Sequence, residues 1–322
     1  MAFDLVTTAY RSGAAYARSV PRPVVELSAR ALSRITATAS AERRMLVGRH
    51  LRRARPGLSG RALDRAVDAT FDSYARYWVD SFRLPDLPPE EVDFHFGVDG
   101  YQHVVESLDA GRGTILVLPH LGGWEWAGFW LTQVMHLEVT VVVEPLEPPA
   151  LFDFFVEFRH RLGMHIVPLG PSAGSEVLRA LKAGHVVCLL SDRDIVGDGV
   201  VLDFFGETTT LPAGPAALAL RTGASLLPVG CYFQGSRGHH AVVQAPVEAV
   251  RQGRLRDDVT RVTTAVAGRL EQLIRAAPEQ WHLQQPNWPS DYDALDAIGR
   301  PHARPLVGPS ARPGGAPTGS AG

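Results

Sequence analysis

The sequence predicts an α/β fold, in which a mixed central sheet carries helices on both faces and follows a helical N-terminal layer. Two patterns lead to this prediction. From residue 114 onward, short apolar runs such as TILVL and VTVVV alternate with segments of amphipathic helical spacing. Up to about residue 85 the spacing is helical, and arginine and alanine dominate. With 322 residues, 45% of them hydrophobic, the chain can bury a large core.

Each expected element follows from its local pattern. The run from residue 64 to residue 90 is typical of a helix that its prolines end. Seven apolar runs predict strands: TILVL (114–118), VTVVV (139–143), HIVPL (165–169), VVCLLS (186–191), VVLDFF (200–205), SLLPVGCYF (225–233) and HAVVQA (240–245). Amphipathic spacing predicts helices near 122–135, 150–162, 174–183, 212–222 and 257–276.

Charge is distributed unevenly, although the formal net charge is only −2. Residues 1–65 contain thirteen arginines against four acidic residues. An arginine near anionic lipid contributes about 1 kcal/mol of binding, and aromatic residues interleave with apolar ones in the first 25 residues, as in an interfacial helix. We therefore expect an anionic membrane surface as a partner, with a solvated helical surface as the alternative. Nucleic acid is not expected, since no recognisable reading motif accompanies the arginines.

The expected location is the cytoplasmic face of the cell membrane, as a peripheral protein. No uninterrupted apolar run reaches the ~18 residues of a spanning helix, and Asp4 and Arg11 argue against a signal peptide. Cys188 and Cys231 lie in apolar strand-like runs without a CxxC pair or a histidine at ligand spacing. We expect neither a disulfide nor a metal site.

Three parts are predicted along the chain. Residues 1–85 form the basic, membrane-associating helical segment, and residues 86–298 form the α/β core. Residues 299–322 consist largely of proline, glycine, alanine and serine, which offer little to bury. We expect this tail to be disordered.

The stretch PHLGGWEW, residues 119–126, places His120 where the TILVL strand ends, and ligands of α/β folds collect at such ends. Gly122 and Gly123 allow a tight turn, and Glu125 could fold back to accept the ring N–H and fix the histidine tautomer. The other ring nitrogen could then take a proton from an alcohol. Backbone N–H groups near the two glycines could stabilise an oxyanion. Residues 119–126 thus form a strand-to-helix corner, the His120 corner, whose groups suit acyl transfer to a hydroxyl. The alternative is a capping histidine beside a surface glutamate.

A second motif favours a different enzyme. GPSAG, residues 170–174, fits the G-x-S-x-G elbow of α/β hydrolases, with Ser172 as the nucleophile. The acid and the base would come from later residues: Asp192 or Asp203, and His239, His240 or His282. Pro171 beside the serine removes a backbone N–H, and no HGGG-type oxyanion segment lies upstream, so we interpret GPSAG as a helix-entry loop. A non-catalytic lipid-binding protein is a third alternative, which an intact His120 and Glu125 disfavour.

The HLGGWE element resembles the H-x-x-x-x-D/E motif of the superfamily that contains the lipid A lauroyl/myristoyl and lysophospholipid acyltransferases. FRHRLG, at 158–163, is similar to the family's second block, and residues 189–228 are similar to its third and fourth blocks. The ending PEQWHLQQPNWPSD, at 278–291, most closely resembles the actinobacterial phosphatidylinositol mannoside acyltransferases. The resemblance covers about residues 5–292.

This resemblance implies that His120 is the catalytic base and Glu125 its orienting partner, where many relatives carry an aspartate. It implies that Arg159 serves the acidic end of a substrate or braces the site. Further candidates for substrate binding are Gly122, Gly123, Asp192, Arg193, Asp194, Phe204 and Phe205. Asp194 is favoured as the acid that approaches the histidine. The two phenylalanines line an acyl channel or pack the core, and packing is favoured.

The implied reaction moves a long acyl chain, such as palmitoyl, from its coenzyme A thioester to a mannose hydroxyl of a phosphatidylinositol mannoside. The 6-position of the mannose is expected. His120 would remove the hydroxyl proton as the oxygen attacks, without a covalent acyl-enzyme. Acyl-coenzyme A is a co-substrate, so no cofactor is implied. A lipid A-like or lysophospholipid acceptor is the alternative within the family.

Overall fold

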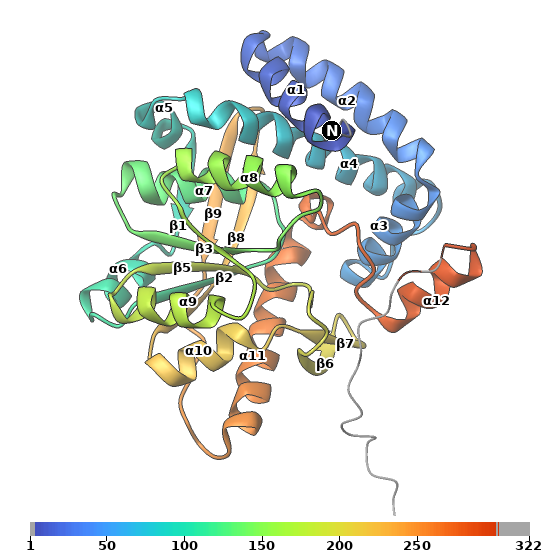
Figure 1. Cartoon of the computed structure of the whole chain (residues 1–322). Coiled ribbons are helices and arrows are strands. Elements are labelled where there is room, and N and C mark those ends of the chain that lie inside the picture. The colour runs from blue at the N-terminus through green and yellow to red at the C-terminus, as the bar shows by residue number, and fades with distance from the viewer. Residues whose placement is uncertain (1–3, 301, 303–322) are drawn as a thin grey trace, which may run out of the picture.

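The computed structural model describes residues 4–300 and residue 302 (Figure 1). The predicted tail therefore lies almost wholly outside the described residues. The N-terminal layer consists of α1 (Leu5–Ser19), α2 (Arg22–Ala39), α3 (Ala41–Ala54) and α4 (Gly60–Arg83), which lie together on one side of the sheet. Asp4 caps α1, because its carboxylate accepts from the backbone N–H groups of Val6 and Thr7. The predicted helical layer is confirmed.

Seven of the nine described strands form one sheet, in the order β1-β9-β8-β2-β5-β3-β4. Neighbouring strands run parallel except β8 and β9, which are antiparallel. Their bounds are β1 (Phe96–Asp99), β2 (Thr114–Leu118), β3 (Val139–Val143), β4 (His165–Pro168), β5 (Val186–Leu190), β8 (Ser225–Gln234) and β9 (Gly238–Val243). The prediction of a mixed sheet is confirmed.

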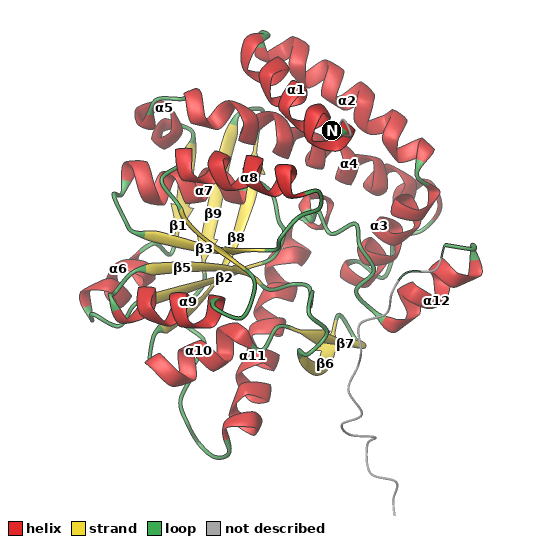
Figure 2. Cartoon of the chain, in the orientation of Figure 1, coloured by secondary structure: helices red, strands yellow, loops and turns green. Residues whose placement is uncertain are grey.

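Alternate residues of β2 enter two different cores. Ile115 and Val117 pack in the core beneath α9 (Ala173–Lys182), α10 (Gly214–Thr222) and α11 (Leu255–Ala276). Leu116 and Leu118 pack on the other face, with α1, α4, α7 (Trp124–Phe129) and α8 (Pro149–Arg161). Successive strand side chains point to opposite faces, so TILVL, whose five residues are all buried, requires cover on both faces. Figure 2 shows helices on either side of the strands.

Shorter elements complete the fold. They are the 3₁₀ turns η1 (Leu84–Asp86) and η3 (Pro278–Gln280), the π-helical turn η2 (Trp130–Val134), and the helices α5 (Pro89–Phe94), α6 (Gln102–Asp109) and α12 (Pro289–Ala297). The run VVLDFF does not join the main sheet. It forms β6 (Val200–Phe204), which pairs with β7 (Glu207–Leu211) as a separate antiparallel hairpin and packs against α11. Buried and exposed residues alternate along β6, so only one face of this strand needs cover. A position outside the main sheet, against α11, provides that cover.

The carboxyl ends of β2 and β5 meet at one point of the sheet edge. The strands pair in parallel with Leu118 opposite Leu190, and the Ser191 N–H donates to the Leu118 carbonyl at 2.8 Å. Residues 119–123 and 191–194 therefore leave the sheet side by side. The C-terminal segment reaches the same point, because Leu121 and Trp281 form an isolated antiparallel bridge.

The outer face of α2 is apolar. Val24, Leu27, Leu32 and Ile35 are 51%, 72%, 64% and 63% exposed, and their spacing places them on one side of the helix. None of the described helices combines the length and the apolar character that crossing a bilayer requires.

Candidate active site

Asp192, just beyond β5, holds the ring of His120. His120 Nδ1 lies 2.7 Å from Asp192 Oδ1, and the His120 backbone N–H donates to Oδ2 at 3.0 Å. The carboxylate thus binds the ring and the main chain of the same residue. The His120 side chain is 28% exposed, whereas that of Asp192 is fully buried. With Nδ1 engaged, Nε2 is the ring nitrogen left for a ligand.

Asp192 is ionised although it is buried. Trp281 Nε1 donates to its Oδ2 at 2.7 Å, and the Asn287 side-chain amide donates to its backbone carbonyl at 2.9 Å. Burial alone would raise the pKa of Asp192, but the electrostatic interaction with His120 and the hydrogen bonds from His120 and Trp281 hold that pKa below its ordinary value. The carboxylate therefore accepts the Nδ1 proton and fixes the tautomer of His120.

Glu125 is not the orienting partner of His120, and that expectation is wrong. Its Oε1 accepts from Nε and Nη2 of Arg159 at 3.1 and 2.7 Å, and from the Tyr77 hydroxyl at 3.2 Å. The backbone path explains this: α7 begins at Trp124, so Glu125 enters its first turn and points between α4 and α8. The carboxylate is 2% exposed and is neutralised by the arginine. Asp192 provides the contact that the sequence assigned to Glu125.

The Glu125–Arg159 pair supports the wall beside His120. The Tyr77 ring, bound to Glu125, stacks on Trp124 with centroids 4.2 Å apart, and Trp124 meets the His120 ring edge-on at 5.6 Å. Burial first, and then the charge of Glu125, raise the pKa of Tyr77 well above its ordinary value, so it remains a hydroxyl donor. Of the two roles expected for Arg159, bracing the site has a contact in the structure.

The two glycines allow the corner to approach β8 and β9 closely. Gly122 has φ +58°, and a Cβ there would lie 2.3 Å from the Cys231 carbonyl oxygen. A Cβ on Gly123 would lie 2.5 Å from His239 Nδ1. The Gly122 N–H donates to the Gln280 carbonyl at 2.9 Å, so it is not free to bind an oxyanion and that expectation is wrong. The oxyanion role of the Gly123 N–H stays a prediction.

Comparison with known proteins identifies the family. A sequence model described as bacterial lipid A biosynthesis acyltransferase matches residues 5–290. The chain belongs to this acyltransferase family. It is 42% identical over 231 residues to a phosphatidylinositol mannoside acyltransferase of Mycolicibacterium smegmatis, across 71% of this chain and 74% of the relative. It is 40% identical over 233 residues to a phosphatidylinositol mannoside acyltransferase of Mycobacterium tuberculosis, across 71% and 72% of the two chains.

These matches confirm the resemblance noted in the sequence, and they make the chain an acyltransferase of lipid biosynthesis. In the acyltransferase, Arg193 and Asp194, which follow Asp192 in the chain, contact residues other than His120. Arg193 pairs with Glu144 at 3.9 Å. Asp194 accepts from the backbone N–H groups of Gly197 and Gly199, both at 2.9 Å. Its carboxylate shapes the following turn, so the preference for Asp194 as the acid near His120 is wrong. A substrate role for Arg193 stays a prediction.

Phe204 and Phe205 of the acyltransferase pack in the core beneath α11. Phe204 is fully buried and stacks on Trp288, with centroids 5.7 Å apart and planes 9° apart. Phe205 is 8% exposed and lies against Trp281 at 5.6 Å. Packing accounts for both side chains, and a role in lining an acyl channel has no contact that supports it.

The residues that a serine hydrolase would combine are separated. Ser172 is exposed at the start of α9, which follows the edge strand β4. His239 and His240 lie on β9, near the opposite edge of the sheet. Asp192 is engaged by His120, and His282 Nε2 lies 2.8 Å from Ser73 Oγ. The GPSAG loop is a helix entry, as interpreted.

Four residues around the His120–Asp192 pair have no role predicted from the sequence: Ser73, Tyr77, Trp281 and Asn287. His282 is predicted there only as a possible base of a serine hydrolase. The His282 backbone N–H donates to the His120 carbonyl at 2.7 Å. Burial first, and then the charge of His120, lower the pKa of His282 to about 3, so it is uncharged at neutral pH. The segment that carries three of these residues was noted only as a family ending, because it lacks any helical or strand period.

The described residues contain no group of three or more His, Cys, Asp or Glu side chains that could hold a metal ion. Cys188 and Cys231 are both free. Burial is the main cause that raises the pKa of each thiol to about 12, so both remain protonated at neutral pH.

Proposed function

We propose that this acyltransferase moves a long acyl chain from a coenzyme A thioester to a mannose hydroxyl of a phosphatidylinositol mannoside. The observation that supports the chemistry most is the hydrogen bond from His120 Nδ1 to buried Asp192. The names of the two relatives support the acceptor. Palmitoyl as the acyl chain and the 6-position of the mannose come from the resemblance in the sequence alone.

His120 acts as the general base in this proposal. Its Nε2 takes the proton of the mannose hydroxyl while the oxygen attacks the thioester carbonyl. The tetrahedral intermediate then expels the coenzyme A thiolate, which takes the proton back from the imidazolium. An ester and free coenzyme A result, with no acyl-enzyme. Asp192, negative and buried, stabilises the positive charge that His120 carries between the two proton transfers.

A membrane surface would bring the lipid acceptor to the site. The apolar face of α2 (Val24, Leu27, Leu32 and Ile35) is flanked by the exposed Arg30 and Arg34. An apolar face beside arginines is the composition of a helix that lies in the headgroup region of an anionic bilayer. We propose that α2 rests on the cytoplasmic leaflet of the cell membrane.

Product formation tests the proposed reaction. Purified protein is incubated with radiolabelled palmitoyl-coenzyme A and mannosylated phosphatidylinositol, beside His120→Ala, Ser172→Ala and a reaction without acceptor. We expect an acylated glycolipid that Ser172→Ala still forms and His120→Ala does not.

Two results would contradict the proposal in different ways. Transfer to a lysophospholipid or a lipid A precursor, but not to the mannoside, would keep the base and replace the acceptor. Release of free fatty acid that depends on Ser172 would replace acyl transfer by hydrolysis.

A further inference from the structure

The proposed mechanism depends on one buried hydrogen bond, between His120 and Asp192. We propose that Trp281 and Asn287, which follow α11 in the chain, are positioning residues that hold Asp192 for this hydrogen bond. The inference rests on the proposed function, in which His120 is the base. It adds a segment that is more than 85 residues from either strand end in the sequence.

Asp192 is held on every polar atom that it offers as an acceptor. Oδ1 meets the His120 ring, and Oδ2 accepts from the His120 backbone and from Trp281 Nε1 at 2.7 Å. Its backbone carbonyl accepts from the Asn287 amide at 2.9 Å. Trp281 and Asn287 are only 3% and 8% exposed, so water has little access to replace either donor. Without the indole N–H, the carboxylate loses the contact that fixes its plane against the imidazole.

The segment is joined to the His120 corner by main-chain contacts. Gln280 accepts from the Gly122 N–H at 2.9 Å, and His282 donates to the His120 carbonyl at 2.7 Å. These two hydrogen bonds flank Trp281 on both sides. The indole is therefore placed by the same backbone that carries the catalytic histidine.

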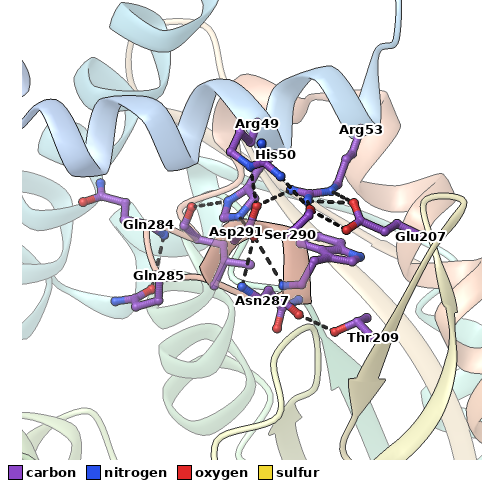
Figure 3. A network of polar contacts seen from close by, with 12 residues as sticks. Arg49, His50, Arg53, Glu207, Thr209, Gln284, Gln285, Asn287, Ser290 and Asp291 are labelled. Carbon is purple, nitrogen blue, oxygen red and sulfur yellow. Dashed lines mark hydrogen bonds and ion pairs between the residues drawn. The ribbon is translucent and has the colours of Figure 1, made fainter. Parts of the chain in front are cut away.

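A buried ionic network fixes the other end of the segment to α3, as Figure 3 shows. Asp291, fully buried, accepts from Arg49 Nε at 2.7 Å and lies 3.2 Å from His50 Nε2. The same carboxylate accepts from the backbone N–H of Asn287 at 3.2 Å. His50 Nδ1 also lies 3.1 Å from the Leu283 carbonyl. Arginine and histidine from α3 thus determine where the Asn287 amide is presented to Asp192.

The test follows the Nδ1–H proton of His120 by proton NMR in the protein without substrate. A proton shared between an imidazole and a carboxylate resonates far downfield, and His120→Asn identifies the signal by its loss. Trp281→Phe keeps an aromatic ring and removes the N–H donor. Trp288→Phe is the matched control, because its indole N–H donates to the Phe204 carbonyl at 3.1 Å and not to Asp192.

We expect Trp281→Phe to shift or broaden the His120 resonance and to lower kcat about 10- to 100-fold. Asn287→Leu, which removes the other donor, is expected to change the resonance in the same way and serves if Trp281→Phe does not fold. Trp288→Phe is expected to keep the parent resonance.

An unchanged resonance in folded Trp281→Phe and Asn287→Leu would overturn the inference. The NMR signal needs no turnover, so it is read separately from the proposed reaction. If the resonance shifts and the parent transfers no acyl group to any acceptor, the proposed function fails while the contact stands.

Discussion

At the scale of single residues, the position of one carboxylate decides the chemistry. Asp192 and Asp194 are identical side chains two positions apart. Asp192 lies 2.7 Å from His120 Nδ1, whereas Asp194 accepts from backbone N–H groups of the turn that follows it. Only the first can hold the tautomer that leaves Nε2 as a base.

Asp192→Asn is expected to lower kcat by about 10³- to 10⁴-fold, because an amide donor opposite Nδ1 favours the wrong tautomer. Asp194→Asn is the matched control and is expected to retain activity within a few-fold. Acyl-transfer rates, with circular dichroism to confirm folding, check the difference. Equal losses in the two variants would mean that Asp192 has no special relation to His120.

Gly122→Ala is expected to destabilise the protein more than Gly111→Ala. Both glycines have positive φ, and that backbone conformation costs an alanine roughly 1–2 kcal/mol. A Cβ at Gly111 meets open space, whereas a Cβ at Gly122 lies 2.3 Å from a backbone oxygen. Urea unfolding measures both variants. Equal free energies of unfolding for the two variants would show that the backbone around Gly122 shifts to accommodate the extra methyl group.

At the scale of elements, buried ion pairs join α3 to the first turn of α12. Arg53 Nη1 lies 2.9 Å from Asp291 and its guanidinium covers the Trp288 ring at 4.0 Å. Burial alone would raise the pKa of Asp291, but the hydrogen bond and charge of His50, the charge of Arg53 and the hydrogen bond from Arg49 lower that pKa strongly. A buried carboxylate with such partners is costly to remove.

Asp291→Asn is expected to lower the free energy of unfolding by about 3–5 kcal/mol at pH 7. A depressed carboxyl pKa contributes stability that is complete above the unfolded value, 3.8, and is lost as pH falls below it. The difference between parent and variant should therefore shrink below about pH 3.8. Denaturant unfolding at several pH values measures it. Exposed Asp109→Asn is the control, and a difference for Asp291→Asn that stays constant with pH would contradict the ionic account.

At the scale of the whole molecule, the N-terminal layer covers one core of the sheet and presents an apolar face outward. α1 and α4 contribute Ala17, Val79 and Phe82 to the core that also contains Leu116 and Leu118 of β2. The outer face of α2 is left without cover by any described residue. The same layer thus covers one face of the sheet and carries the proposed lipid contact.

Leu27→Glu together with Ile35→Glu is expected to weaken binding to anionic vesicles at least tenfold. Each change removes a side chain whose burial contributes about 1.5–3 kcal/mol. Val250→Glu, which changes a residue 53% exposed in the loop before α11, is the control. Vesicle sedimentation at low salt measures the bound fraction. Unchanged binding of the double variant would place the membrane contact on another surface.

Much of the fold was predictable from local pattern. The apolar runs at 114–118, 139–143 and 186–190 are strands in the structure, and their side chains are buried or half-buried on both faces of the sheet. The strand β1 and the hairpin partner β7 were not expected. β1 is short and only half-buried, and β7 is the polar run ETTTL, so neither carries a strong hydrophobic signal.

The sequence by itself determined the fold class, the family and the position of His120 at a strand end, because hydrophobic period and motif are local properties. Only the tertiary structure decided which carboxylate faces that histidine. Parallel pairing of β2 and β5 brings Asp192 to His120, and the start of α7 turns Glu125 toward Arg159. The same holds for Trp281 and Asn287, which reach Asp192 from a distant segment. Contacts between residues far apart in the chain depend on register and packing, and no spacing in the sequence records them.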